Sequence, residues 1–206
     1  MVLRILSIIA ILLLAVWLVL FNKKNVGSWD AFKSWFMENL KTTFSKECLK
    51  NWKRSVYFVL LLVIALSALT GFIPFLILGV PLGGFSLMLH VVLAPVFAIL
   101  AAAFLLGRAE THTFDQNSAA FLKSVFSKSE KKDSLADQFW AKFYFWIFII
   151  FSIIIASMVF SMYSIFGTIG QDALLNIHRG ASVVLFIAVI LFTLRLVRLS
   201  SAAKSD

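Results

Sequence analysis

The sequence predicts an all-α, polytopic membrane protein with five transmembrane helices. Of the 206 residues, 61% are hydrophobic, whereas an average soluble domain has about 45–50%, and the mean hydropathy is +0.96. The apolar residues gather in runs long enough to cross about 30 Å of hydrocarbon as helices. No segment alternates polar and apolar residues like a strand of an outer-membrane barrel, so helices are expected to satisfy the backbone in lipid.

Five apolar runs are the expected spans, and they cover residues 3–21, 55–78, 84–106, 143–166 and 174–197. The first is followed by Lys23 and Lys24 without a small-residue cleavage site, which favours a retained helix over a signal peptide. Pro74 predicts a kink or an early end of the second span. Residues 79–83 and 167–172 are expected to form turns.

These runs divide the chain into an N-terminal transmembrane helix (1–22), an interfacial segment (23–53), a bundle (54–198) and a polar tail (199–206). The bundle consists of the second to fifth spans, and a loop at 107–142 interrupts it. Its four helices are expected to form the haem-binding part of the molecule, because two of them carry a histidine.

The interfacial segment has the pattern of an amphipathic helix. Apolar side chains recur there at three- and four-residue steps, at Trp29, Phe32, Phe36, Leu40, Phe44 and Cys48. Such a helix lies in the headgroup region or packs on a partner subunit, and the pattern favours neither. A second, shorter helix with an apolar face is expected at residues 118–126, within the loop.

The net charge of +9 follows membrane topology rather than nucleic-acid binding, because the basic residues lie between the apolar runs. Eight lysines and arginines lie between the first two spans, six in the loop at 107–142 and three at the C-terminal end, while the other side has only Arg4 and Arg179. The positive-inside rule therefore predicts a plasma (inner) membrane protein with its N-terminus outside and its long loops and C-terminus cytoplasmic. The single cysteine, Cys48, excludes a disulfide within the chain and an iron–sulfur cluster.

Two histidines lie inside apolar runs and are the candidate ligands. His90 follows Pro81 by nine residues, and His178 follows Asp172 by six, so both lie about 9–14 Å inside the outward turns if each helix starts there. One histidine in a membrane helix is often a hydrogen-bond donor to a neighbouring helix. Two at matched depth favour ligation of one haem, with a quinone or ion site as the alternative, while zinc would require further ligands.

Residues near the histidines fit a haem in the outer leaflet. Gly71 on the second span would leave room for a flat macrocycle, and Arg179 is expected to pair with a haem propionate. Gln171 and Asp172 could line a quinone site or contact an outward partner, while Asp172 alone could cap the fifth helix.

Three further residues are expected to have no ligand role. His112 lies in the charged loop and is expected to be solvated, and Met158 and Met162 have the four-residue spacing of packing residues.

Three short stretches resemble membrane b-type cytochromes: Leu69, Thr70 and Gly71 before a turn; Leu87, Met88, Leu89 and His90 opening a helix; and Ile177, His178, Arg179, Gly180 and Ala181 opening another. The second to fifth spans are similar to the four-helix quinone-reactive subunits of formate dehydrogenase, hydrogenase and succinate dehydrogenase type complexes. The resemblance implies haem b with bis-histidine ligation, and two intramembrane histidines allow one haem, with iron held by His90 and His178.

The resemblance also implies a function. The implied function is electron transport between the quinone pool and a partner redox subunit. The chain would be a cytochrome b subunit of an oxidoreductase complex rather than a complete enzyme. The expected partners are the other subunits of that complex, a quinone and the lipid bilayer, without nucleic acid. The alternatives are a non-haem scaffold or assembly subunit of a multi-protein complex, and a small transporter.

Overall fold

The computed structural model describes residues 2–21, 29–46, 48–127, 133–156, 158 and 167–202. All regular elements in these ranges are helices: α1 (Val2–Phe21), α2 (Trp29–Thr43), α3 (Trp52–Phe72), η1 (Ile73–Leu78), α4 (Gly84–Arg108), η2 (Glu110–His112), α5 (Gln116–Ser127), α6 (Asp133–Ala156) and α7 (Gly167–Ala202). The all-helical class is therefore confirmed.

Four helical segments are long and apolar enough to cross a membrane: Trp52–Leu78, Gly84–Arg108, Gln138–Ile155 and Gly167–Val197. By the length and composition of these helices the protein is membrane-embedded. They correspond to the second to fifth predicted spans. Helix α1 has 20 residues, but the apolar helix among its described side chains, Leu3–Leu13, is shorter than a span. The first predicted span, and with it the count of five, thus stays a prediction.

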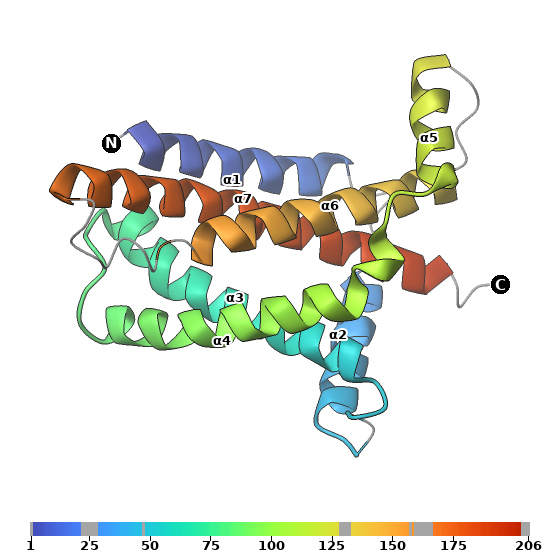
Figure 1. The fold of residues 1–206 in the computed structure, drawn as a ribbon, viewed down its shortest axis with the longest axis horizontal. Helices are drawn as coiled ribbons and strands as arrows, with labels where there is room; N and C mark the ends of the chain where they lie inside the picture. Colours follow the sequence, from blue (N-terminus) through green and yellow to red (C-terminus); the bar gives the residue numbers. More distant parts are fainter. Residues whose placement is uncertain are drawn as a thin grey trace.

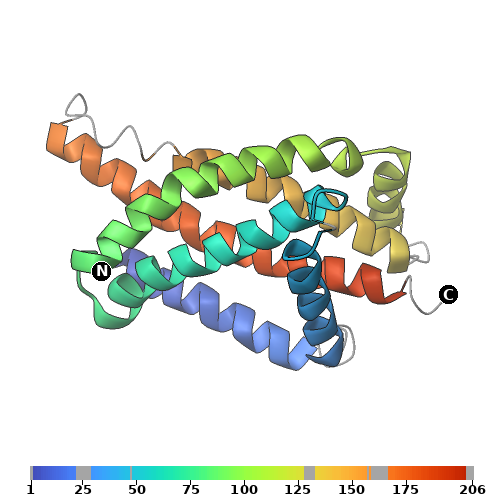
Figure 2. The same ribbon diagram turned by 90° about the horizontal axis from the view of Figure 1, so that it is seen from below.

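The long helices run along one axis (Figure 1). Helix α3 packs against α4, α6 packs against α7, and α1 lies along α7, while further contacts join α4 to α6 and α3 to α7. Helices α2 and α5 run crosswise to this axis at the end where α7 finishes (Figures 1 and 2). We call this end the basic end. The opposite end, where α3 and η1 lead through Gly79 into α4, is the turn end.

Buried apolar side chains concentrate toward the basic end. They come from the first two thirds of α3, the middle of α6 and the second half of α4 and α7: Tyr57, Leu60, Val63, Ile64, Phe97, Ala101, Phe104, Ala141, Phe145, Phe148, Ile149, Leu185, Val189 and Phe192. Tyr57 stacks on Phe104 with ring centroids 5.1 Å apart. Its hydroxyl lies 2.7 Å from Thr193 Oγ1, and because the Thr193 hydroxyl donates to the Val189 carbonyl, Tyr57 is the donor. This bond joins α3 to α7.

Helix α2 packs on the chain's own α3. Phe36 meets the fully buried Phe58 edge to face, with centroids 5.2 Å apart. Arg54 donates to Asn39 Oδ1 at 2.6 Å and pairs with Glu38 at 3.1 Å. The amphipathic helix is therefore held by this chain, and its crosswise direction is that of a helix lying along a membrane surface.

The turn end has the break that Pro74 predicts, since α3 changes at residue 73 into the π-helix η1. Gly79 follows in the left-handed region, with φ +69°. Arg4 of α1 donates to the carbonyls of Leu76 at 3.0 Å and Ile77 at 3.1 Å. Because these carbonyls are at a helix C-terminus, a cation there is favourable. Arg4 thus fastens α1 to the turn.

Two predicted boundaries, the start of α7 and the start of α6, are wrong. Residues 167–172 are helical rather than a turn, because α7 begins at Gly167, so Asp172 lies inside the helix and does not cap it. Helix α6 begins at Asp133 and not at 143. In both places backbone hydrogen bonding continues beyond the hydrocarbon-length run that hydropathy detects. The polar tail is also helical as far as Ala202.

Candidate functional site

The two predicted ligands meet at the interior between α4 and α7. The ring centroids of His90 and His178 are 6.2 Å apart, and the ring planes are nearly perpendicular at 84°. His90 lies six residues into α4, about 9 Å from its start, and His178 lies eleven residues into α7, about 16 Å from its start. The two depths differ because α7 begins earlier than predicted. Figure 1 shows that this end of α7 extends beyond its neighbours, which allows the two rings to meet.

His90 is oriented by α3. Its Nδ1 lies 3.1 Å from Thr70 Oγ1, and the Thr70 hydroxyl donates its one hydrogen to the carbonyls of Leu66 and Ser67, both at 3.0 Å. When that hydrogen points to a carbonyl, Thr70 accepts from His90, so that Nδ1 carries the proton and Nε2 keeps its lone pair. This is the tautomer that a metal-binding imidazole needs.

The backbone of α3 comes close to the same ring. A Cβ added to Gly71 would lie 3.3 Å from His90 Cε1, which is a tight contact. Gly71 therefore allows the imidazole to lie against α3, next to the Thr70 hydroxyl. The sequence pointed to Gly71 as a small residue near the pair, but it did not reveal the bond from Thr70.

His178 has a nitrogen without a partner. Its Nδ1 is buried and makes no hydrogen bond, although the Ile155 backbone lies within hydrogen-bonding reach of the imidazole. Its own carbonyl accepts a bond of 2.8 Å from Ser182 Oγ. Most buried polar atoms have a partner, so the unpaired nitrogen marks His178 as a side chain that can bind a further group.

The spacing of the two rings matches two ligands of one metal. An imidazole nitrogen lies about 2.0 Å from a bound transition metal and its ring centre about 1.1 Å farther, so two rings on opposite sides of one metal have centroids roughly 6 Å apart. Within the described residues, no three His, Cys, Asp or Glu side chains gather as metal ligands. Two imidazoles alone would leave the remaining coordination positions of a metal to ligands from outside the chain.

The packing around the two histidines differs between the two helices. On α7, Ala181 and Val183 are buried close to His178, with 4% and 6% exposed. On α4, the nearest buried apolar side chain is Phe97, seven residues from His90, and Met88 on the other side of His90 is 68% exposed. The pair therefore lies between a well-packed part of α7 and a sparsely packed start of α4.

Arg179 points to η1. Its guanidinium carbon lies 4.7 Å from the centroid of the Phe75 ring, a cation–π contact. This places a fixed cation one residue from His178. Gln171 and Asp172 lie in the first turns of α7. Met158 is half-buried, while Met162 lies outside the described residues.

The expectation for His112 is wrong, because its side chain is buried at the basic end, with 7% exposed. Its ring stacks on Phe145 at 4.4 Å, its Nδ1 lies 3.0 Å from the Arg108 carbonyl, and Trp146 Nε1 donates to its carbonyl at 3.0 Å. Burial lowers the pKa of His112, although the Arg108 carbonyl opposes that shift. The histidine is therefore a neutral packing residue. In the sequence, the only sign of this is that no lysine lies next to His112 along the chain.

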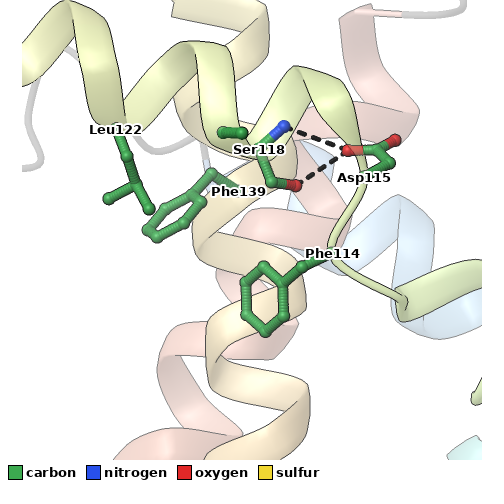
Figure 3. A pocket seen from close by; sticks show the side chains of 6 residues that line it. Phe114, Asp115, Ser118, Leu122 and Phe139 are labelled. Atoms are coloured by element: carbon green, nitrogen blue, oxygen red, sulfur yellow. Dashed lines mark hydrogen bonds between the residues drawn. The ribbon is translucent and has the colours of Figure 1, made fainter.

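An open hollow of about 410 Å³ lies at the basic end and not at the histidine pair. Its walls are mostly apolar and come from α5, the segment before it and α6: Phe114, Asp115, Ser118, Ala119, Leu122 and Phe139. Figure 3 shows Asp115 accepting from the backbone N–H and the hydroxyl of Ser118, at 3.0 and 2.8 Å. These bonds make Asp115 the N-cap of α5, which confirms a helix where residues 118–126 predict one.

Comparisons with protein-family models, with curated proteins and with solved structures find no match for this chain. The function must therefore be inferred from the geometry of the site.

Proposed function

We propose that this chain is a membrane-bound b-type cytochrome subunit that carries electrons between the quinone pool and a partner redox subunit. One haem b would be held by His90 and His178, within a four-helix bundle made of α3, α4, α6 and α7. The observation that carries the proposal is the pair of imidazoles, 6.2 Å apart on two membrane helices. Ionisable side chains inside a membrane are costly and are usually retained for function.

The chain's own residues would prepare this site. Thr70 would orient His90 and favour the tautomer with the proton on Nδ1, and the buried Nδ1 of His178 has no hydrogen-bond partner. Arg179 lies next to the second ligand and would pair with a carboxylate of the cofactor. Haem b held by His90 and His178 would supply one-electron chemistry.

The proposal includes an orientation. Nearly all lysines and arginines of the sequence lie before or at the start of α3, between the end of α4 and the first half of α6, or near the C-terminus, so the basic end would face the cytoplasm of a plasma membrane and the turn end would face outward. Gln171 and Asp172 at the start of α7 would then meet an outward partner subunit or a quinone. A haem near the turn end would exchange electrons on that side.

The test is the absorption spectrum of the purified protein, oxidised and then reduced. We expect a Soret band and an α band in the reduced wild-type protein, and loss of both bands in His90→Ala and in His178→Ala. His112→Gln is the matched control, because it removes the third histidine and should leave the bands unchanged. Their absence from the wild type, or their survival in either ligand variant, would contradict the proposal.

Thr70→Val tests the tautomer argument separately. Groups that orient a metal-binding histidine typically contribute about 10–100-fold to metal affinity. We therefore expect Thr70→Val to retain the bands at high haem concentration and to lose haem about 10–100-fold more readily. Unchanged haem retention would mean that Thr70 does not orient the ligand.

A scaffold or assembly subunit without haem is the second candidate. The hollow beside α5 favours it, because Phe114 and Leu122 are exposed there by 52% and 44% and could receive a partner protein. In that case the two imidazoles would be packing residues. The same absorption spectrum separates the two candidates.

A further inference from the structure

Buried polar atoms without a partner gather at two places in the described part of the chain. One is the histidine pair, with Nδ1 of His178. The other three atoms lie at the basic end, on α2, α3 and α4, and they are Thr43 Oγ1, Ser55 Oγ and Arg108 Nε. Such atoms are rare in folded proteins. The second group points to a missing partner at a place that the proposed function does not use.

Arg108 is the only cation among these three residues, and it is firmly placed. It ends α4, where its carbonyl takes bonds from Thr111 Oγ1 at 2.9 Å and from the His112 ring at 3.0 Å. The preceding residue, Gly107, touches the ring of Trp52, since an added Cβ there would lie 2.9 Å from it. Trp52 is 42% exposed. Tryptophans at the ends of spans lie at the level of the lipid headgroups, so Arg108 lies at that level too.

The surroundings of Arg108 add positive charge. Arg54 is close enough to interact electrostatically with its guanidinium, and Ser55, the next residue of α3, is 4% exposed. Lys142 lies near His112, which itself lies near Arg108. Arg54 and Arg108 therefore bring two positive charges close together at the start of α3 and the end of α4.

The nearby carboxylates are already engaged. Glu38 pairs with Arg54 at 3.1 Å, and Asp115 pairs with Lys142 at 2.9 Å. No carboxylate in the described residues pairs with Arg108. A water molecule would satisfy the Nε–H group but would leave the charge of this half-buried guanidinium without a counter-ion. A charge that is partly removed from water is more stable beside an anion, and an anion would satisfy both the Nε–H group and the charge.

We propose that Arg108 binds the phosphate of an anionic phospholipid at the basic end, between α3 and α4. A guanidinium offers a planar fork of N–H donors that fits phosphate oxygens, and the hydroxyl of Ser55 adds a donor. Basic pockets between transmembrane helices are known sites for anionic headgroups. The position of Trp52 brings the guanidinium to the depth where such phosphates lie. This lipid site is independent of haem.

The test uses the full-length protein, delipidated in neutral detergent, and native mass spectrometry. Phosphatidylglycerol and phosphatidylcholine are added in separate titrations, and inorganic phosphate is added as a third ligand. The variants are Arg108→Gln, Arg108→Lys and the control Lys53→Gln. Lys53 is exposed and lies over the Trp52 ring, 5.9 Å from its centroid, so its variant has the same change in net charge at the same end.

We expect the wild type and Lys53→Gln to retain phosphatidylglycerol at least tenfold more strongly than phosphatidylcholine. Arg108→Gln should lose about tenfold in phosphatidylglycerol affinity, which corresponds to about 1.4 kcal/mol. Arg108→Lys keeps the charge without the fork and should lie between them. Circular dichroism reports whether each variant is folded.

Three results would overturn the proposal. The first is equal binding of phosphatidylglycerol and phosphatidylcholine by the wild type, a result that does not depend on whether any variant folds. The second is an equal loss of phosphatidylglycerol in Lys53→Gln and in the Arg108 variants. The third is inorganic phosphate competing as well as the lipid, which would assign the site to a free anion.

Discussion

Gly79 offers the sharpest test of how the turn end is built. It lies in the left-handed region with φ +69°, and an added Cβ would run into the guanidinium of Arg4. A residue with a Cβ costs about 1–2 kcal/mol in that conformation. Displacing Arg4 also weakens its bonds to the Leu76 and Ile77 carbonyls. One hydrogen bond from a charged group contributes about 1.5–3 kcal/mol, and we take the lower part of this range because Arg4 is only half-buried. Gly79→Ala should therefore destabilise the protein by roughly 2–4 kcal/mol.

The assay is reversible unfolding in mixed detergent micelles, followed by far-ultraviolet circular dichroism. Gly83→Ala is the control, because Gly83 has an extended backbone with φ −156° and no atom near an added Cβ, so its variant should change stability by less than about 0.5 kcal/mol. In the background of Arg4→Leu, Gly79→Ala should cost only the backbone part, about 1–2 kcal/mol. Equal effects of the two glycine variants, or full additivity of Arg4→Leu and Gly79→Ala, would refute the reasoning.

Three further outcomes are expected. Tyr57→Phe removes the donor to Thr193 and should cost about 0.5–1.5 kcal/mol of unfolding free energy in the same assay. Because burial lowers the pKa of His112, the unfolded chain takes up a proton below pH of about 6.5 that the folded chain refuses; stability should fall as the pH drops through that value, and His112→Gln should remove this dependence. Lys142, with Ser118, holds the pKa of Asp115 well below its usual range. The cap of α5 should therefore be intact above pH of about 4 and be lost only in stronger acid. Asp115→Ala should reduce the helix signal in circular dichroism at neutral pH.

Much of the architecture is local information, which explains why the sequence predicted it. Length and hydropathy alone define four candidate spans, and Pro74 defines the break before η1, since proline cannot donate a backbone hydrogen bond. The sequence also paired His90 with His178, but it did so from an assumed equal depth, whereas the rings meet because α7 begins earlier and extends beyond its neighbours. The roles of these residues in haem binding remain for the spectrum to decide.

The parts that sequence reasoning missed depend on contacts between distant residues. The bonds from Arg4 to η1 join residues more than 70 positions apart, and no pattern along the chain announces them. The burial of His112 depends on Phe145 and Trp146 of α6. The early start of α7 was missed for another reason. Gln171 and Asp172 resemble turn residues, but a helix can carry polar side chains where it extends beyond the hydrocarbon.

The bond between Tyr57 and Thr193 acts at a distance from the place where it forms. Thr193 lies fifteen residues beyond His178 on α7, and Tyr57 lies thirteen before Thr70 on α3, so both separations are about 20 Å along their helices. The same two helices thus carry a clamp at one end and the orienting groups of the histidine pair at the other. A helix held in this way cannot rotate about its axis without breaking the clamp. The Tyr57–Thr193 bond therefore also restrains how α7 turns His178 relative to Thr70, although it lies at the other end of the two helices.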